Sequence, residues 1–221
     1  MSADEEEFHF EPNPGLPEAL PEGERILWSG SPEWKAAALE IFHIRAVAIY
    51  AGLLVLWRAV AHLHDGGTLL SLPGHLVVLV SVFACGLAIL LILAKATAKT
   101  TIYTITNRRV VMRIGVALTM SINLPFKQIL SADYRKAPLG TGCIALTMAQ
   151  SGGLGYVVLW PHVRPFRFSK PQPMLRAIKN AEEVAGILGR ALAAAQGGEV
   201  SPVIHIKGPK TRTSTAEPVA A

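Results

Sequence analysis

The sequence predicts an α+β membrane protein, in which a two-helix transmembrane hairpin precedes an antiparallel β-barrel or sandwich capped by a C-terminal helix. Three observations predict this fold class. The chain is too apolar for an ordinary soluble domain, with 51% hydrophobic and only 17% charged residues. Two long apolar stretches lie in its first half. Short segments with alternating apolar and polar residues follow, and after them comes one segment with apolar residues at helical spacing.

The formal net charge of +5 hides an asymmetry along the chain, because eight of the 16 acidic residues lie before Arg25, the first basic residue. Residues 1–19 combine most of this acidic run with prolines, so they bury too little apolar surface to fold, and we expect a disordered acidic arm. The arm is either a solvating tail or an acidic contact for a basic partner or for the basic part of this chain. Residues 197–221 contain several Pro and Thr and predict a flexible tail.

Residues 41–61 and 76–94 are the two predicted transmembrane helices. A helix needs about 20 residues, at 1.5 Å per residue, to cross roughly 30 Å of hydrocarbon, and both stretches are close to this length. The second stretch has no charge and ends at Lys95. The first contains Arg45 and Arg58, whose side chains can extend to the two interfaces. Residues 62–75 are rich in glycine and form the predicted connecting loop.

Basic residues predict how the hairpin is oriented. Lys35 and Arg45 lie near the start of the first span, and Lys95 and Lys99 follow the second, whereas the loop contains no Lys or Arg. Basic segments resist translocation. We therefore expect a multi-pass protein of the bacterial inner membrane, with both termini in the cytoplasm and the loop in the periplasm.

Six short strands are predicted after the second span, each bounded by Asn, Gly or Pro turn signals. They cover residues 100–106, 109–114, 118–124, 129–134, 143–148 and 156–160. A helix is placed after Pro171 and Pro173, because proline suits a helix N-terminus. Its apolar stripe consists of Leu175, Ile178, Ala181, Ala185, Leu188 and Leu192. The strands and this helix form one predicted domain, residues 99–196.

Several stretches of this region resemble a known family. The segment YTITNRRVVMRIG, residues 103–115, resembles the first hairpin of bacterial pleckstrin-homology (PH) domains, where Asn allows a positive φ at the turn. Four more stretches stand in the order found in the PuhB family of photosynthetic complex assembly proteins: LPEGERILWSGSPEW (20–34), INLPFKQI (122–129), GTGCIALT (140–147) and LWPHVRPFRFSKPQPMLRAI (159–178). The resemblance covers roughly residues 20–192.

The resemblance to the PuhB family implies a PH-like barrel or sandwich, with the lead-in residues 20–40 packing back onto it. It implies a non-catalytic assembly factor in the intracytoplasmic membrane of purple bacteria. Such a factor binds nascent subunits of the reaction centre and of core light-harvesting complex 1 at the cytoplasmic face. The family has no established catalytic residues, and we read no known catalytic motif in the soluble part, so we do not expect an enzyme.

Charge supports an alternative hypothesis, a PH-like module that binds anionic lipid at the membrane surface and has no photosynthetic partner. Between Lys95 and Arg190 there are fourteen basic residues and three acidic ones. Each suitably placed base attracts anionic headgroups by about 1 kcal/mol. Nucleic acid is not an expected partner, because the sequence offers neither an aromatic stacking platform nor a known reading motif. A homodimer stays open as a further alternative.

Two groups of residues are candidates for lipid or partner contacts. The first consists of Arg108, Arg109 and Arg113, the first two in a predicted hairpin turn that we place close to the end of the second span. The alternative is that they are solvated turn residues. The second group lies in the segment WPHVRPFR, whose aromatic, Pro and Arg content is typical of interfaces. It consists of Trp160, His162, Arg164, Phe166 and Arg167.

The second group also has two interpretations. It forms a partner-binding edge, or else Trp160 and Phe166 fill the barrel interior while the prolines shape an edge strand. Small residues on the spans permit close packing, either within the hairpin or against a partner's helix. They are Ala48, Gly52, Ala84, Gly86 and Ala88.

No cofactor or metal site is predicted. Cys85 and Cys143 fall in different layers, and the sequence has no CxxC, so neither a disulfide nor a metal cluster is expected. Histidine can ligate the magnesium of bacteriochlorophyll. However, the histidines of the hairpin lie near the span ends, where a polar tip needs no cofactor, so pigment ligation is the less favoured hypothesis. They are His43, His62, His64 and His75.

Overall fold

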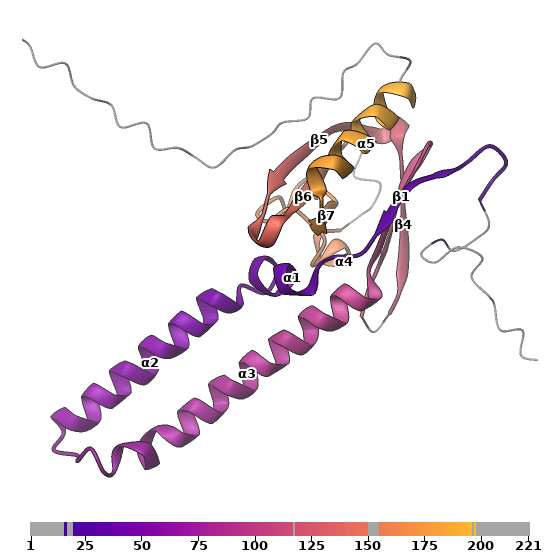
Figure 1. Cartoon of the computed structure of the whole chain (residues 1–221). Coiled ribbons are helices and arrows are strands. Elements are labelled where there is room, and N and C mark those ends of the chain that lie inside the picture. Colours follow the sequence, from indigo (N-terminus) through magenta and orange to yellow (C-terminus); the bar gives the residue numbers. More distant parts are fainter. Residues whose placement is uncertain (1–15, 17–19, 117, 150–154, 196, 198–221) are drawn as a thin grey trace, which may run out of the picture.

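A helical hairpin carries a β-sheet domain at one end of the computed structural model (Figure 1). The structure describes Leu16, residues 20–116, 118–149, 155–195 and Gly197. The predictions for the acidic arm 1–19 and the tail 197–221 therefore fall almost entirely outside the described residues. The first half of the chain forms β1 (Ile26–Gly30), α1 (Trp34–Glu40), α2 (Ile44–His64) and α3 (Leu72–Thr100).

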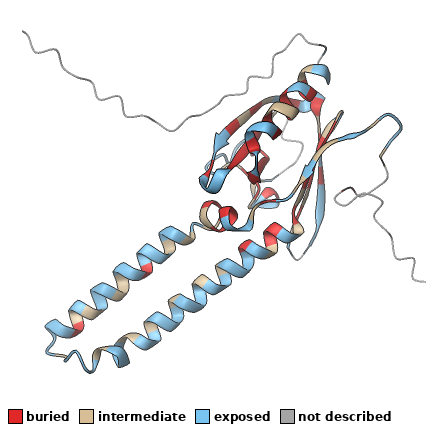
Figure 2. Ribbon diagram, in the orientation of Figure 1, coloured by how far each residue is buried: buried red, intermediate tan, exposed pale blue. Residues whose placement is uncertain are grey.

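Helices α2 and α3 are long and apolar enough to cross a membrane, by length and composition. They lie side by side and antiparallel, and the rings of Tyr50 and Phe83 meet edge to face with centroids 6.4 Å apart. Most of their other side chains are exposed (Figure 2). An apolar surface of this extent is unusual on a soluble monomer. Both helices end later than predicted, and α3 also begins earlier than the expected span 76–94.

The remaining elements form the domain. They are β2 (Ile102–Thr106), β3 (Arg109–Ile114), β4 (Met120–Pro125), η1 (Phe126–Gln128), β5 (Ile129–Lys136), η2 (Pro138–Gly140), β6 (Thr141–Met148), α4 (Tyr156–Leu159), β7 (Met174–Lys179) and α5 (Ala181–Ala195). The described strands pair antiparallel in two sheets, in the orders β1-β2-β3-β4 and β5-β6-β7. The α+β prediction is confirmed, and the sandwich alternative is the correct one, because the two sheets do not close into a barrel.

The core of the domain fills the space between the two sheets and under α5. Tyr103, Ile105 and Met112 from the first sheet and Ile144 from the second are fully buried there. Helix α5 adds Val184, Leu188 and Leu192, which recur at four-residue steps and so lie on one face. The part of the predicted apolar stripe that lies in α5, which is Ala181, Ala185, Leu188 and Leu192, is therefore on the face that covers the core.

The lead-in residues 20–40 contribute to both parts of the molecule. Strand β1 pairs with β2 at the edge of the first sheet. Helix α1 follows and packs against α3 and β7, with Ala36 and Ala37 against Ala177. The small size of these alanines lets the backbones approach, and the Glu33 N–H donates to the Ala177 carbonyl oxygen at 2.8 Å. The lead-in thus ties the domain to the base of the hairpin.

Two predicted elements are wrong. Residues 156–160, expected as a strand, form the single helical turn α4. The helix expected directly after Pro173 is preceded by strand β7, so Leu175 and Ile178 lie in the second sheet and α5 begins only at Ala181. Asn180 makes the transition with a φ of 50°, in the left-handed region that Asn tolerates better than most residues.

Candidate functional site

The predicted arginine group is split between opposite ends of the first sheet. Strand β2 starts directly after α3, and Ile102 pairs with Arg113 at this end. Arg108 and Arg109 follow the other end of β2, so a strand of five residues, about 17 Å, separates them from α3. The expectation that this turn lies close to the second span is therefore wrong, whereas Arg113 does lie there.

Arg109 is also committed to an internal ion pair. Its guanidinium binds Glu24 in a bidentate manner, with Nε to Oε1 at 2.8 Å and Nη2 to Oε2 at 3.1 Å. The Glu24 side chain is almost completely buried. Asn107 accepts a hydrogen bond from the Arg25 N–H at 3.0 Å and donates one to the Gly23 carbonyl oxygen at 3.0 Å. The hairpin turn is thus clamped by the lead-in segment, and Arg108 is its exposed base.

The second predicted group contains both internal and surface residues. Arg164 donates from Nη1 to Asp133 at 2.6 Å and to Gln172 at 3.0 Å, so it is an internal ion pair. His162 is fully buried and cannot be a surface contact, which corrects the prediction for this residue. Trp160 and Phe166 are exposed, as is Arg167. The interpretation that Trp160 and Phe166 fill the domain interior is therefore wrong.

His162 belongs to a buried polar chain that starts at the end of α3. Its Nδ1 lies 2.6 Å from the Tyr103 hydroxyl and its Nε2 lies 3.2 Å from the Thr101 hydroxyl. The Tyr103 oxygen accepts from the Arg176 N–H at 3.3 Å, which leaves its own hydrogen for Nδ1. Nε2 then carries the remaining imidazole hydrogen and donates to Thr101. Every polar atom of the ring is satisfied, so the histidine is structural.

Burial sets the protonation of this chain. It lowers the pKa of His162 to about 3, with a smaller contribution from the positive charge of Arg176. Burial also raises the pKa of Tyr103 above its usual value. The imidazole is therefore neutral and the phenol protonated at physiological pH. Neither group is poised to exchange protons near neutrality, as a catalytic acid or base requires.

A second buried cluster joins α1 to the second sheet. Arg176 donates from Nη2 to the Glu40 carbonyl oxygen at 2.9 Å and from Nη1 to the Pro161 carbonyl oxygen at 3.1 Å. The Glu40 carboxylate pairs with the Arg135 guanidinium and accepts a hydrogen bond from the Cys143 thiol at 3.2 Å. Burial, followed by the charge of Glu40, raises the pKa of Cys143 to about 12. The thiol is thus protonated and unreactive.

Sequence reasoning missed this cluster, although one signal was present. Arg176 interrupts the apolar run MLRAI, and a charge in a buried run needs a partner. Nothing in the sequence shows that Glu40, 136 positions away, lies beside it. Among the described residues, no group of three His, Cys, Asp or Glu side chains is arranged to hold a metal ion.

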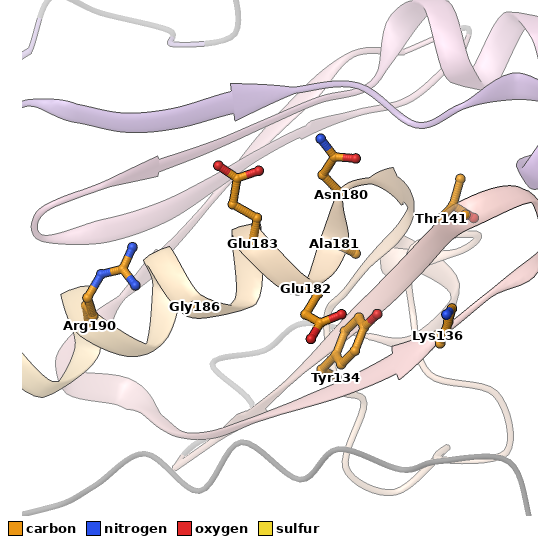
Figure 3. Close-up of a pocket in the computed structure, with 10 residues that line it drawn as sticks. Tyr134, Lys136, Thr141, Asn180, Ala181, Glu182, Glu183, Gly186 and Arg190 are labelled. Atoms are coloured by element: carbon orange, nitrogen blue, oxygen red, sulfur yellow. The ribbon is translucent and has the colours of Figure 1, made fainter.

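An open hollow of about 660 Å³ lies between β5 and the first turns of α5 (Figure 3). Tyr134 from β5 lies beside Glu182 from α5 (Figure 3), and Lys136, Glu183 and Arg190 also line the hollow. Burial and the negative charge of Glu182 raise the pKa of Tyr134. Two carboxylates and two bases line the hollow, so it offers no net charge that would select a ligand, and we assign it none.

The histidines of the hairpin make contacts at its closed end. The rings of His62 and His75 lie 4.0 Å apart, and His62 Nε2 lies 2.9 Å from the Ser71 hydroxyl. His64 lies beside Asp65, with Nδ1 3.8 Å from Oδ1. The contacts of His62 with Ser71 and His75 join the last turn of α2 to the start of α3. His43 lies at the opposite end, directly before α2.

Residues 35–192 match the bacterial PH domain family, and the matched region includes nearly all of α1, the hairpin, strands β2 to β7 and most of α5, whereas β1 lies before it. The chain belongs to the bacterial PH domain family. This family is non-enzymatic in general. In this bacterial PH domain protein, the hairpin lies within the matched region.

A Rhodobacter capsulatus protein is 41% identical to this bacterial PH domain protein over 186 residues, which cover 84% of the chain and 87% of the relative. It is described as a 23.7 kDa protein in the 5′ region of puhA. This relationship agrees with the resemblance to the PuhB family and links the relative to photosynthesis genes. No solved structure matches the chain.

Proposed function

We propose that this bacterial PH domain protein is a non-catalytic factor for assembly of the photosynthetic reaction centre and core light-harvesting complex 1. In this proposal, α2 and α3 cross the inner membrane, and both termini and the PH domain lie in the cytoplasm. The protein binds nascent subunits at this face. The observation that carries the proposal is a pair of exposed apolar helices joined to a PH domain, in a chain whose relative lies beside puhA.

The orientation follows from charge. Residues 65–71 between the two helices contain no Lys or Arg, whereas Lys95 and Lys99 lie in the last turns of α3. Because basic residues close to a span tend to stay in the cytoplasm, these charges support the proposed cytoplasmic position of the domain. Only Thr101 separates α3 from β2, and its hydroxyl lies beside His162, so the domain has no flexible linker at this point.

The outer faces of the hairpin are the proposed binding surfaces for partner helices. A side chain built at Gly52 on α2 or Gly86 on α3 would meet no atom within 4 Å. These glycines therefore do not serve packing between α2 and α3. Helices in lipid associate by close backbone approach at small residues. Outward glycines at mid-helix fit this kind of contact with a second membrane protein.

The non-catalytic role is supported by the state of the reactive groups described above. Cys143 and His162 are buried, hydrogen-bonded and held in their neutral forms. Glu40 and Arg176 are used to join α1 to the second sheet. Recognition through surfaces is the function that this arrangement supports best.

Deletion of the gene in a phototrophic host tests the proposal. We expect less assembled reaction centre and light-harvesting complex in solubilised membranes, measured by near-infrared absorption, with unchanged total extractable bacteriochlorophyll. The wild-type gene should restore assembly, and Gly52→Leu combined with Gly86→Leu should restore less. Gly74→Leu is the matched control, because Gly74 is equally open but lies in the first turns of α3. Normal complex levels in the deletion strain would contradict the proposal.

Co-purification identifies the partner. The tagged chain, extracted in mild detergent during pigment induction, should retain subunits of the two complexes, and the double glycine variant should retain fewer. Recovery of copies of the chain alone would favour a homodimer instead.

A further inference from the structure

Three segments of the domain that lie near the hairpin expose large apolar side chains. Outside α2, α3 and their connection, the large apolar side chains that are most exposed among the described residues are Leu118, Leu139, Val157, Trp160, Phe166 and Phe168. We call these six residues the apolar base. Three separate segments of the chain contribute to it. A soluble domain would have no reason to expose all of them on one side.

The first segment connects β3 to β4. Ile114 pairs with Met120 at the end of this hairpin, next to the pair of Ile102 with Arg113 where β2 leaves α3. Helix α3 contacts β3, and Figure 1 shows this end of β3 and β4 beside the last turns of α3. Leu118 in the connection is 87% exposed. Its side chain therefore projects at the level of the helix end.

The second segment contains α4 and the residues that follow it. The Trp160 ring meets the Phe42 ring edge to face, with centroids 6.5 Å apart, and Phe42 lies two residues before α2. Phe168 packs on Tyr156 of α4, with ring centroids 4.6 Å apart. Phe166 is 88% exposed. Trp160 of this segment thus lies at the start of α2.

The third segment is η2, the turn between β5 and β6. It contacts α1, which immediately precedes α2. Leu139 at its centre is exposed and has a φ of 60°. Apolar tips are therefore present beside the domain-side ends of both α2 and α3.

The lengths of the helices place these tips at a membrane interface. Helix α2 has 21 residues, enough for the roughly 30 Å of hydrocarbon. Helix α3 has 29 residues and is about 43 Å long, so about 13 Å of it extends beyond the hydrocarbon. Its last six residues, which include Lys95 and Lys99, lie at headgroup level when its apolar part is centred. The first segment of the apolar base lies beside this part of the hairpin.

The charges at this end favour anionic headgroups. Arg167 and Lys170 alternate with the aromatic residues in the segment Phe166–Lys170, and both are exposed. Glu33 and Glu40 are the acidic residues of α1 and its start, and they are paired with Lys179 and Arg135. Aromatic rings with nearby bases are the composition typical of the membrane interface.

We propose that the apolar base is a lipid-contacting surface, which enters the headgroup layer of the same bilayer that α2 and α3 cross and holds the PH domain against it. The inference depends on the membrane location proposed above. It does not depend on whether the protein has a photosynthetic partner. Because three segments around both helices contribute, the surface fixes the tilt of the domain as well as its distance from the membrane.

Spin labelling of the full chain in lipid vesicles tests this inference. Leu118→Cys and Phe166→Cys are labelled in a Cys85→Ala background, in which the buried Cys143 stays unmodified. Leu130→Cys is the matched control, because Leu130 is an exposed leucine at the opposite end of the domain, where Ile129 pairs with Met148. The measurement compares collisions of each label with oxygen and with a water-soluble nickel chelate.

In vesicles of phosphatidylcholine and phosphatidylglycerol, we expect the ratio of oxygen to nickel collisions to be several-fold higher at positions 118 and 166 than at position 130. Equal ratios at all three positions would overturn the proposal. The proposal would also be overturned if the labels at positions 118 and 166 were shielded from the nickel chelate in native membranes but not in lipid vesicles. The surface would then be covered by a protein and not by lipid. Both readouts are independent of complex assembly.

Discussion

Arg176 on β7 donates a hydrogen bond to the backbone oxygen of Glu40, the last residue of α1, at 2.9 Å. This contact joins the second sheet to the base of the hairpin, and the Glu40 side chain extends the connection to Arg135 and Cys143. The Arg176 side chain is buried, and its Nε has no hydrogen-bond partner within the described part of the chain. The positive charge of the Arg176 guanidinium is thus buried and is stabilised by hydrogen bonds to two backbone carbonyl oxygens.

Replacement of Arg176 by Met should lower the free energy of unfolding by about 2–4 kcal/mol, because two buried carbonyl oxygens lose their donor. Lysine should not restore it, since one ammonium group cannot reproduce the planar fork that reaches Glu40 and Pro161 together. Urea unfolding in detergent, followed by tryptophan fluorescence, measures the change. The exposed Arg167→Met variant should behave as wild type, and equal stability of both variants would contradict the buried role.

His162 should make stability depend on pH. Its pKa is about 3 in the folded chain and near 6.5 when unfolded. Between these values the unfolded chain binds a proton that the folded chain does not, so the free energy of unfolding falls as the pH drops below about 6.5, by up to about 5 kcal/mol near pH 3. His162→Gln should be less stable at pH 8, and its deficit should shrink toward pH 4. A constant deficit across this range would show that the imidazole does not resist protonation.

The Cys143 thiol reports whether α1 stays docked. With a pKa of about 12 and no exposure, it should not react with a water-soluble maleimide at pH 7.5 in a Cys85→Ala background. Glu40→Gln should increase its labelling rate, because loss of the carboxylate breaks the pair with Arg135 and loosens the site. Mass spectrometry after timed labelling measures both rates. Rapid labelling of the folded Cys85→Ala chain would be incompatible with the described packing.

Glu24→Gln should lower the free energy of unfolding by about 1–2 kcal/mol, because the Arg109 guanidinium loses a buried, charged bidentate partner. Glu22→Gln is the matched control, since this acid is exposed and close by in the same segment. Thermal unfolding in detergent compares the two.

Arg108→Gln should leave both stability and membrane contact unchanged, whereas loss of vesicle contact in this variant would support the arginine-turn hypothesis for lipid binding.

Patterns local to the sequence predicted most of the fold. The uncharged stretch that became α3 and the Asn107 turn between β2 and β3 are signals that need no tertiary information. The strand prediction for the segment YVVLW was wrong, because a short apolar run is compatible with either a strand or a helical turn. The helix prediction for residues 174–179 was wrong, because the two prolines before them are compatible with an edge strand as well as with a helix start.

Partners across the structure could not be predicted in the same way. His162 was recognised as notable, but its burial depends on Tyr103 and Thr101, about sixty positions earlier. The position of the Arg108 turn depends on the direction of β2, which no residue type encodes. Trp160 and Phe166, which were predicted as contact residues, are exposed, and Trp160 lies beside Phe42 at the start of α2.

The most direct test of the central claim is the sidedness of two single cysteines in native membranes, in the Cys85→Ala background. Leu70→Cys places an exposed thiol in the connection between α2 and α3, and Leu130→Cys places one on the PH domain. A membrane-impermeant maleimide should label position 70 alone in spheroplasts and position 130 alone in inverted vesicles. Labelling of position 130 in intact spheroplasts, or release of the chain from membranes by carbonate, would contradict a hairpin that crosses the membrane and holds the PH domain at its cytoplasmic face.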